Sequence, residues 1–318
     1  MFITIIIATR NRATDLARTV LSICTRKNLQ FSDWEVIVVD NGSTDRTNEV
    51  CREYGKSFPR HFRYIEEKKL GKSNAVNTAF QSASGDVVAM IDDDVICQSD
   101  YLEGIRNVFS SGFSEIVQGR IFVDYHSKRP KWFKQDVYFD QMMLLSDLGD
   151  QRCELQRSLW GANIVVPAAA IAKVGGFCPE LGAGANGFGE DAEFDHRLRH
   201  AGYRIIYSPE IVVRHQVTSE RLNIKFVLSR SLKIGLCSAS YSPPPRVALS
   251  RYTLYLIKCI LLEVPLMVVD LGRSQRGRAI RRACAQLQQI GFVAQHWRFK
   301  IYGQPRLNIP SIQMVIVE

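Results

Sequence analysis

The first two thirds of the chain alternate short apolar segments with amphipathic ones, and this alternation limits the possible folds more than any other feature. Strands are predicted at Phe2–Ala8, Glu35–Asp40, Phe62–Glu66 and Asp86–Ile91. Helices are predicted near 13–25, 45–55, 71–82 and 99–110. Such alternation predicts an α/β domain in which helices cover both faces of a mostly parallel sheet.

Polar residues follow three of these strands, at the point where each strand ends. The segments are Thr9–Arg12, Asp40–Asp45 and Asp92–Asp94. In open parallel sheets, ligands bind beyond the carboxyl ends of the strands. We therefore expect the three segments to converge on one crevice.

Three consecutive carboxylates, Asp92–Asp94, close an apolar strand. Adjacent carboxylates repel one another unless a cation lies among them. On an extended chain, Asp92 and Asp94 would project to one face and Asp93 to the other. The triplet therefore predicts a D-x-D pair that holds Mg²⁺ or Mn²⁺ against a diphosphate, with a solvated acidic turn or a helix cap as the alternative.

A second motif, Asp40–Asp45, joins a strand end to a helix start through an Asn-Gly turn. Capping by Ser43 or Thr44 accounts for part of this pattern. Asp40 would also be placed to accept hydrogen bonds from a base or ribose, and the following helix N-terminus favours a nearby phosphate.

The net charge of +9 is concentrated near one end of the chain. Residues 1–245 carry thirty Lys and Arg against twenty-nine acids, whereas residues 246–306 carry eleven against two. Because the excess charge is confined to one segment, we expect no nucleic-acid partner. The apolar start of the chain lacks a basic region before it, which predicts a strand and a cytoplasmic protein rather than a secretory signal.

The basic segment follows a proline run, Pro243–Pro245, and an apolar run, Tyr252–Leu271. Lys258, Glu263 and Asp270 interrupt the apolar run too often for an unpaired bilayer span. The favoured interpretation is an amphipathic helix that lies in the plane of an anionic membrane surface. A buried helix followed by a solvated basic one remains the alternative.

Two segments that precede the proline run break the alternation of strands and helices. Residues 124–157 are charged and aromatic, and we interpret them as a mobile or lid-like insertion before a strand at Leu159–Val166. Gly175–Gly189 is rich in glycine, which predicts a flexible loop that could close over a ligand.

Six short motifs follow one another along residues 1 to about 215. They are Ile7–Arg12, Val39–Asp45, Gly71–Ala75, Asp92–Asp94, Trp160–Asn163 and Gly189–Asp191. In this order and at these separations they resemble glycosyltransferase family 2. The resemblance implies a Rossmann-like GT-A fold, a nucleotide-diphosphate sugar donor, a divalent cation and inversion at the anomeric carbon. We expect a catalytic domain over 1–220, with a nucleotide-binding half to about 111 and an acceptor half from 112, and a helical, basic, membrane-associated region over 221–318.

The resemblance also implies roles for individual residues. It assigns donor binding to Thr9, Arg12, Asp40, Lys72, Asp92 and Asp93, the metal to Asp94, Asp92 and His215, and the sugar or acceptor to Trp160, Gly161 and Asn163.

Sugar transfer also needs a base for the attacking hydroxyl, and the resemblance gives this role to Asp191. Its spacing of three from Phe194 supports the role, because this spacing puts Asp191 on the apolar, inward face of its helix. Glu190 is the second candidate and is expected to point elsewhere. Both acids could instead serve only to complement the helix dipole.

The sequence thus predicts an inverting glycosyltransferase that moves a sugar from a nucleotide-diphosphate sugar to a hydroxyl of a lipid-linked or polysaccharide acceptor. The favoured donor is a UDP-sugar. We expect the enzyme to use Mn²⁺ or Mg²⁺ and to lie peripherally on the cytoplasmic face of the inner (plasma) membrane. Three alternatives stay open. They are a nucleotidyltransferase that makes a nucleotide sugar, a non-catalytic membrane adaptor on a transferase fold, and a phosphatase with Asp92 as its nucleophile.

Overall fold

The computed structural model describes residues 1–25, 27–110, 115–185, 187–241 and 249–302. The chain divides into two compact units. The first comprises Met1–Asp124, Leu144–Asn186 and Glu190–Gln216, and the second comprises Tyr125–Met143, Gly187–Gly189 and the chain from Val217 onward. The segment from Tyr125 to Met143 therefore groups with the C-terminal helices, although the sequence analysis assigned it to the acceptor half of the catalytic domain.

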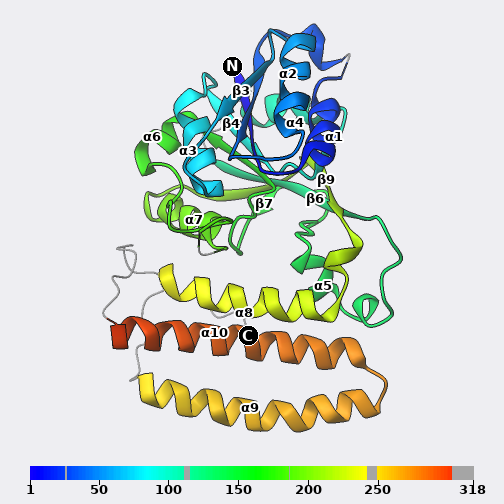
Figure 1. Ribbon diagram of the computed structural model, residues 1–318, viewed down its shortest axis with the longest axis vertical. Coiled ribbons are helices and arrows are strands. Elements are labelled where there is room, and N and C mark those ends of the chain that lie inside the picture. Colours follow the sequence, from blue (N-terminus) through cyan, green and yellow to red (C-terminus); the bar gives the residue numbers. More distant parts are fainter. Residues whose placement is uncertain (26, 111–114, 186, 242–248, 303–318) are drawn as a thin grey trace. The chain divides into compact units, whose positions relative to one another are not determined.

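The first unit is built on one mixed sheet (Figure 1), whose described strands follow the order β3-β2-β1-β4-β8-β6-β9-β5, with β7 beside β9. The strands are β1 (Ile3–Thr9), β2 (Trp34–Asp40), β3 (Phe62–Glu66), β4 (Val87–Ile91), β5 (Val95–Cys97), β6 (Ile116–Tyr125), β7 (Cys153–Glu154), β8 (Asn163–Pro167) and β9 (Ile205–Val217). β1 to β4 pair in parallel, whereas β8 runs antiparallel to β4 and β6, and β5 and β7 run antiparallel to β9. The expected α/β class is confirmed, but only β1 to β4 form the parallel part.

Helices cover both faces of this sheet, as the alternation predicted (Figure 1). They are α1 (Ala13–Ile23), α2 (Thr47–Ser57), α3 (Lys72–Ser82), α4 (Tyr101–Phe109), α6 (Ala168–Val174) and α7 (Glu190–His200), with a 3-10 turn η1 (Asn28–Gln30). In β1, Ile5 and Ile7 pack into a core with α1, α2 and α4, while Ile6 packs into a second core with α3, α6 and α7. Side chains alternate between the faces of a strand, so an apolar strand supplies both cores.

The strand predicted at Leu159–Val166 begins only at Asn163. The preceding residues form a turn that is held from the side, because the Trp160 amide donates to Gln118 Oε1 at 2.7 Å and the Leu159 amide donates to Asp195 Oδ1 at 3.3 Å. These hydrogen bonds to side chains take the place of the strand-to-strand backbone hydrogen bonds that the apolar sequence predicted.

The part of the glycine-rich segment from Leu181 to Gly184 is docked rather than free. The Lys72 amide donates to the Ala183 carbonyl and Ser73 Oγ donates to the Leu181 carbonyl, both at 2.8 Å. Gly184 has a φ of +88°, and a Cβ there would come within 3.0 Å of Gly71 Cα. The segment therefore packs on the N-terminus of α3, where only a residue without a side chain fits.

The second unit contains three long helices, α8 (Ile224–Tyr241), α9 (Leu249–Gly272) and α10 (Arg276–Tyr302), and α10 lies between the other two (Figure 1). α8 and α10 approach closely through glycines, because a Cβ on Gly235 would lie 2.0 Å from the Gln288 carbonyl oxygen and one on Gly291 would lie 2.5 Å from that of Leu232. Among the described helices, none combines the length and the apolar character needed to cross a membrane. The proline run at Pro243–Pro245 lies outside the described residues.

Residues 125–143, within the expected lid-like insertion, form short elements around an aromatic cluster. These elements are the 3-10 turn η2 (Phe133–Gln135) and α5 (Val137–Met142), and another 3-10 turn, η3 (Ser219–Arg221), precedes α8. Phe133 and Phe139 are fully buried, with ring centroids 5.4 Å apart, and Trp132 meets Phe139 at 5.0 Å. The aromatic residues that set this segment apart in sequence therefore form a packed cluster.

Substituting Gly235→Ala should push α8 and α10 apart and cost about 1–3 kcal/mol in the free energy of unfolding, the usual cost of overpacking. Gly272→Ala is the matched control, because a Cβ at that position meets nothing within 4 Å. Denaturant unfolding of both variants checks this. Equal stability of Gly235→Ala and Gly272→Ala would contradict the close packing.

Candidate active site

The acidic triplet lies in a turn between β4 and β5, so the expected projection of Asp92 together with Asp94 is wrong. Alternation between faces applies to an extended strand, and β4 ends at Ile91. Asp92 accepts a hydrogen bond from Lys72 Nζ at 2.7 Å, whereas Asp94 Oδ2 accepts one from Arg12 at 3.2 Å. Two side-chain cations thus offset part of the repulsion within the triplet.

Lys72, in the first turn of α3, joins two segments that are distant in sequence. Its ammonium lies 2.7 Å from Asp92 Oδ1 and 3.7 Å from Glu190 Oε1 at the start of α7. Burial lowers the pKa of Lys72, but the charges of Asp92 and Glu190 more than offset this effect and raise it above the ordinary value. Lys72 is therefore a permanent cation among carboxylates.

Glu190 and Asp191 both reach this cluster, which corrects the expectation that Glu190 points elsewhere. Burial, and then the charge of Asp191, raise the pKa of Glu190 to about 7 against the opposing charge of Lys72. Burial also raises the pKa of Asp191, although Lys72 and the amides of Gly161 and Ala192 favour its anion. The start of α7 therefore presents two neighbouring acids whose charges interact. Glu190 is less exposed to solvent than Asp191.

Thr9 and Arg12, at the end of β1, contact the other half of the triplet. Thr9 Oγ1 donates to Asp93 Oδ2 at 2.7 Å. Burial and the charge of Asp94 raise the pKa of Asp93 to about 7, although Arg12 and Thr9 favour its anion. The structure thus brings Thr9, Arg12, Asp93 and Asp94 together, as the convergence of strand ends predicted.

Asp94 and His215 form the part of the site that fits a divalent cation. Asp94 Oδ1 lies 3.4 Å from His215 Nε2, and both side chains are buried. A carboxylate oxygen and an imidazole nitrogen are suitable Mn²⁺ ligands, so the donor set matches the expected metal. In the described ranges, no group of three or more His, Cys, Asp or Glu side chains is arranged to hold a metal ion. Asp92, the other expected ligand, contacts Lys72 instead.

Asp40 ends β2 as expected, but its carboxylate is buried and engaged. Oδ1 accepts the Ser43 amide at 2.9 Å, and Oδ2 accepts the hydroxyl of Tyr64 at 3.2 Å. The adjacent Asn41 donates through Nδ2 to the Glu67 and Lys69 carbonyls and accepts the Gly71 amide. Asp40 therefore fixes the turn after β2, and its predicted contact with a nucleotide base remains a prediction.

Within the Trp160–Asn163 turn, only the first half lies near the acids. The Gly161 amide donates to Asp191 Oδ2 at 3.1 Å, and a Cβ on Gly161 would lie 3.6 Å from Lys72 Nζ. Asn163, in contrast, is fully buried, donates to the carbonyls of Arg120 and Ile211, and accepts from the Tyr101 hydroxyl. Its expected contact with the sugar or acceptor is wrong, because these hydrogen bonds commit its side chain to the framework.

Arg157 is a site residue that the sequence analysis did not identify. Its guanidinium carbon stacks 3.6 Å from the centroid of the Trp160 ring, and its side chain donates to Ser146 Oγ and to the Ser158 carbonyl. Burial lowers the pKa of Arg157 to about 10, while the charge of Asp191 acts in the opposite direction. An arginine three residues before a tryptophan carries no distinctive signal in sequence.

Known proteins similar to this chain share both its sequence pattern and its fold. Residues 4–172 match Glycosyl transferase family 2. Glycosyltransferase AglE from Haloferax volcanii is 25% identical over 215 residues, covering 67% of this chain and 66% of the relative. Glucosyl-dolichyl phosphate glucuronosyltransferase from the same organism is 22% identical over 210 residues, covering 64% and 66%. The chain thus spans about two thirds of the length of these relatives.

A solved structure, mannosyltransferase PcManGT from Pyrobaculum calidifontis in complex with GDP-Man and Mn²⁺, matches with a TM-score of 0.62 at 20% identity. The match covers 93% of this chain and 87% of that one, and at this identity it supports the fold alone. The expected GT-A-type fold is confirmed. Because the family match at 4–172 spans more than half of the 318 residues, the chain belongs to glycosyl transferase family 2.

Proposed function

We propose that the protein transfers a sugar from a nucleotide-diphosphate sugar to a hydroxyl group, with inversion at the anomeric carbon. The observation that carries the proposal is the pair of neighbouring acids at the start of α7, of which Glu190 is buried and 3.7 Å from Lys72, and Asp191 is partly buried. Family membership and the fold shared with a mannosyltransferase bound to GDP-Man support a donor of this class.

In this proposal Asp191 is the general base. The acceptor oxygen forms a bond to the anomeric carbon as the bond to the diphosphate oxygen breaks, and the hydroxyl proton passes to the Asp191 carboxylate. The amides of Gly161 and Ala192 hold one oxygen each of that carboxylate. The raised pKa of Asp191 makes it a stronger base than an ordinary carboxylate.

The rest of the site would bind the donor. Arg12 and Lys72 supply positive charge beside the acidic turn, and Thr9 holds Asp93 in place. Asp94 and His215 would hold Mn²⁺ or Mg²⁺, which supplies charge stabilisation for the departing diphosphate. The Mn²⁺ in the PcManGT complex supports a cation of this kind.

We further propose a lipid-linked or polysaccharide acceptor at an anionic membrane surface on the cytoplasmic side. The relative that acts on glucosyl-dolichyl phosphate supports a lipid-linked acceptor. The outer face of α9 supports the proposed contact with a membrane surface, because it exposes apolar side chains. Leu254, Leu261, Leu262 and Val268 are 60–67% exposed. Residues 249–302 carry nine Lys and Arg against two acids, which suits anionic lipid.

Substituting Asp191→Asn should lower nucleoside diphosphate release from the donor by about 10²–10⁴-fold, since general bases contribute this much. Binding of the diphosphate with Mn²⁺, measured by calorimetry, should stay unchanged. Asp100→Asn, which removes an exposed carboxylate outside the site, is the control. An Asp191→Asn protein with normal turnover would end the base assignment.

The pH profile gives a second test. Because the base must be anionic, kcat/KM should fall as the pH drops through the pKa of Asp191, which burial raises above the ordinary aspartate value near 4. Glu190→Gln removes a like charge, so the acid limb should move to lower pH by roughly one unit. A wild-type profile that stays flat down to about pH 5 contradicts the proposal.

The membrane proposal is tested on α9. Replacing Leu261 and Leu262 by Gln should lower partitioning onto vesicles of phosphatidylcholine and phosphatidylglycerol by about tenfold or more, because each exposed leucine would bury apolar surface in lipid. Replacing Leu21 and Leu148, which are 55% and 49% exposed, is the matched control. If both double variants partition like the wild type, α9 does not form the lipid-facing surface.

A further inference from the structure

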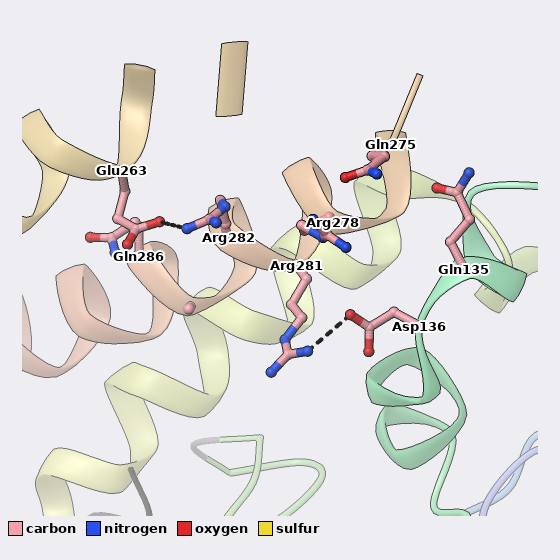
Figure 2. Close-up of a pocket in the computed structure, with 9 residues that line it drawn as sticks. Gln135, Asp136, Glu263, Gln275, Arg278, Arg281, Arg282 and Gln286 are labelled. Atoms are coloured by element: carbon pink, nitrogen blue, oxygen red, sulfur yellow. Dashed lines mark hydrogen bonds and ion pairs between the residues drawn. The ribbon is translucent and has the colours of Figure 1, made fainter. Parts of the chain in front are cut away.

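A polar cavity of about 670 Å³ lies within the second unit, between α9, α10 and the residues just before α5 (Figure 2). α10 contributes Arg278, Arg281 and Arg282 to its walls, and α9 contributes Glu263. Neither the acidic cluster of the candidate active site nor its base takes part in this cavity. The transfer chemistry therefore gives it no role.

Two of the three arginines are neutralised by carboxylates. Arg282 pairs with Glu263 at 2.6 Å and Arg281 pairs with Asp136 at 3.0 Å (Figure 2). Arg282 also pairs with Asp270 at 2.9 Å. Arg278 has no carboxylate partner among the described residues, and its side chain is exposed. The cavity thus offers an uncompensated guanidinium beside two that are already held in place. Guanidinium groups match phosphate oxygens in geometry and charge.

The cavity also offers acceptors that lack donors. Gln275 Oε1 and Gln286 Oε1 are buried, and neither has a hydrogen-bond partner within the described chain. Both side chains line the cavity (Figure 2). A buried amide oxygen without a partner carries a desolvation cost that a hydroxyl group of a ligand would remove. A ligand that fits therefore carries an anionic phosphate and, next to it, hydroxyl groups.

The apolar face of α9 indicates where such a ligand comes from. Glu263 lies in the cavity wall, whereas Leu254, Leu261 and Val268 on the opposite face of α9 are 63–67% exposed. If that apolar face lies at the boundary of the acyl chains, the side of α9 that carries the cavity lies at the level of the lipid headgroups, which carry a phosphate diester. A soluble phosphate would not need an apolar surface beside its site.

We propose that this cavity binds the phosphoglycerol headgroup of an anionic phospholipid, with Arg278 as the phosphate contact and the two glutamines as acceptors for the glycerol hydroxyls. This inference rests on the membrane association proposed above. It adds a specific headgroup site to a general attraction between basic residues and an anionic surface.

The test compares Arg278→Gln with Arg298→Gln in the full chain. Arg298 is also exposed and lies on α10, but it does not line the cavity, so both variants remove the same charge. Partitioning is measured by co-sedimentation with phosphatidylcholine vesicles, with and without phosphatidylglycerol, and melting temperatures without lipid check that both variants fold. A further arm adds soluble glycerol 1-phosphate as competitor.

Arg298→Gln should lower partitioning onto the anionic vesicles by at most about fivefold, the usual effect of one basic residue near a charged surface. Arg278→Gln should lower it by more than about tenfold and leave partitioning onto neutral vesicles unchanged. Vesicles with phosphatidic acid, matched in surface charge but lacking glycerol hydroxyls, should bind the wild type more weakly.

The outcomes separate this inference from the proposal on which it rests. If the wild type binds vesicles but Arg278→Gln and Arg298→Gln lose the same amount, general electrostatics explain the binding and the headgroup site is overturned. If glycerol 1-phosphate raises the melting temperature of the protein while the protein does not bind vesicles, the site takes a soluble phosphate instead. If the wild type binds neither vesicles nor glycerol 1-phosphate, the membrane association and the headgroup site both fail.

Discussion

The ammonium group of Lys72 connects the two halves of the candidate active site, because it contacts Asp92 after β4 and Glu190 at the start of α7. Buried charges are costly unless they are paired, and loss of one partner leaves the others uncompensated. The position of Lys72 is fixed by the backbone, since its amide donates to Ala183 in the glycine-rich segment. The spacing of the acids, their ionisation and the docking of that segment therefore depend on one another.

Ion pairing also determines what the second unit presents to its surroundings. The acids of α9, Glu263 and Asp270, both pair with Arg282 of α10. These pairs turn the acidic groups toward α10 and leave the opposite face of α9 largely apolar, while Arg278 of α10 keeps an uncompensated charge. The two acidic interruptions of the apolar run, Glu263 and Asp270, are therefore internal contacts of the helix pair, whereas Lys258 is exposed.

The sequence predicted the features that depend on local pattern. The strands that became β1 to β4 and the convergence of their ends follow from apolar periodicity and from the geometry of parallel sheets. The predictions that were wrong depended on partners remote in sequence. Asp92 turned toward Lys72 and Asn163 became a framework residue, because the contacts that hold them come from α3, β6 and β9. Arg157 was missed for the same reason, since its stacking on Trp160 has no distinctive sequence pattern.

The central claim is that Lys72 sets the ionisation of the two acids at the start of α7. Carbon-13 NMR of the side-chain carboxyls, recorded against pH in the wild type and in Lys72→Met, measures this directly. The account predicts that Glu190 titrates with a pKa of about 7 in the wild type, and at a clearly higher pH in Lys72→Met, because removing the cation disfavours the anion. A Glu190 carboxyl that titrates in the ordinary range of an exposed glutamate in both proteins would contradict the account.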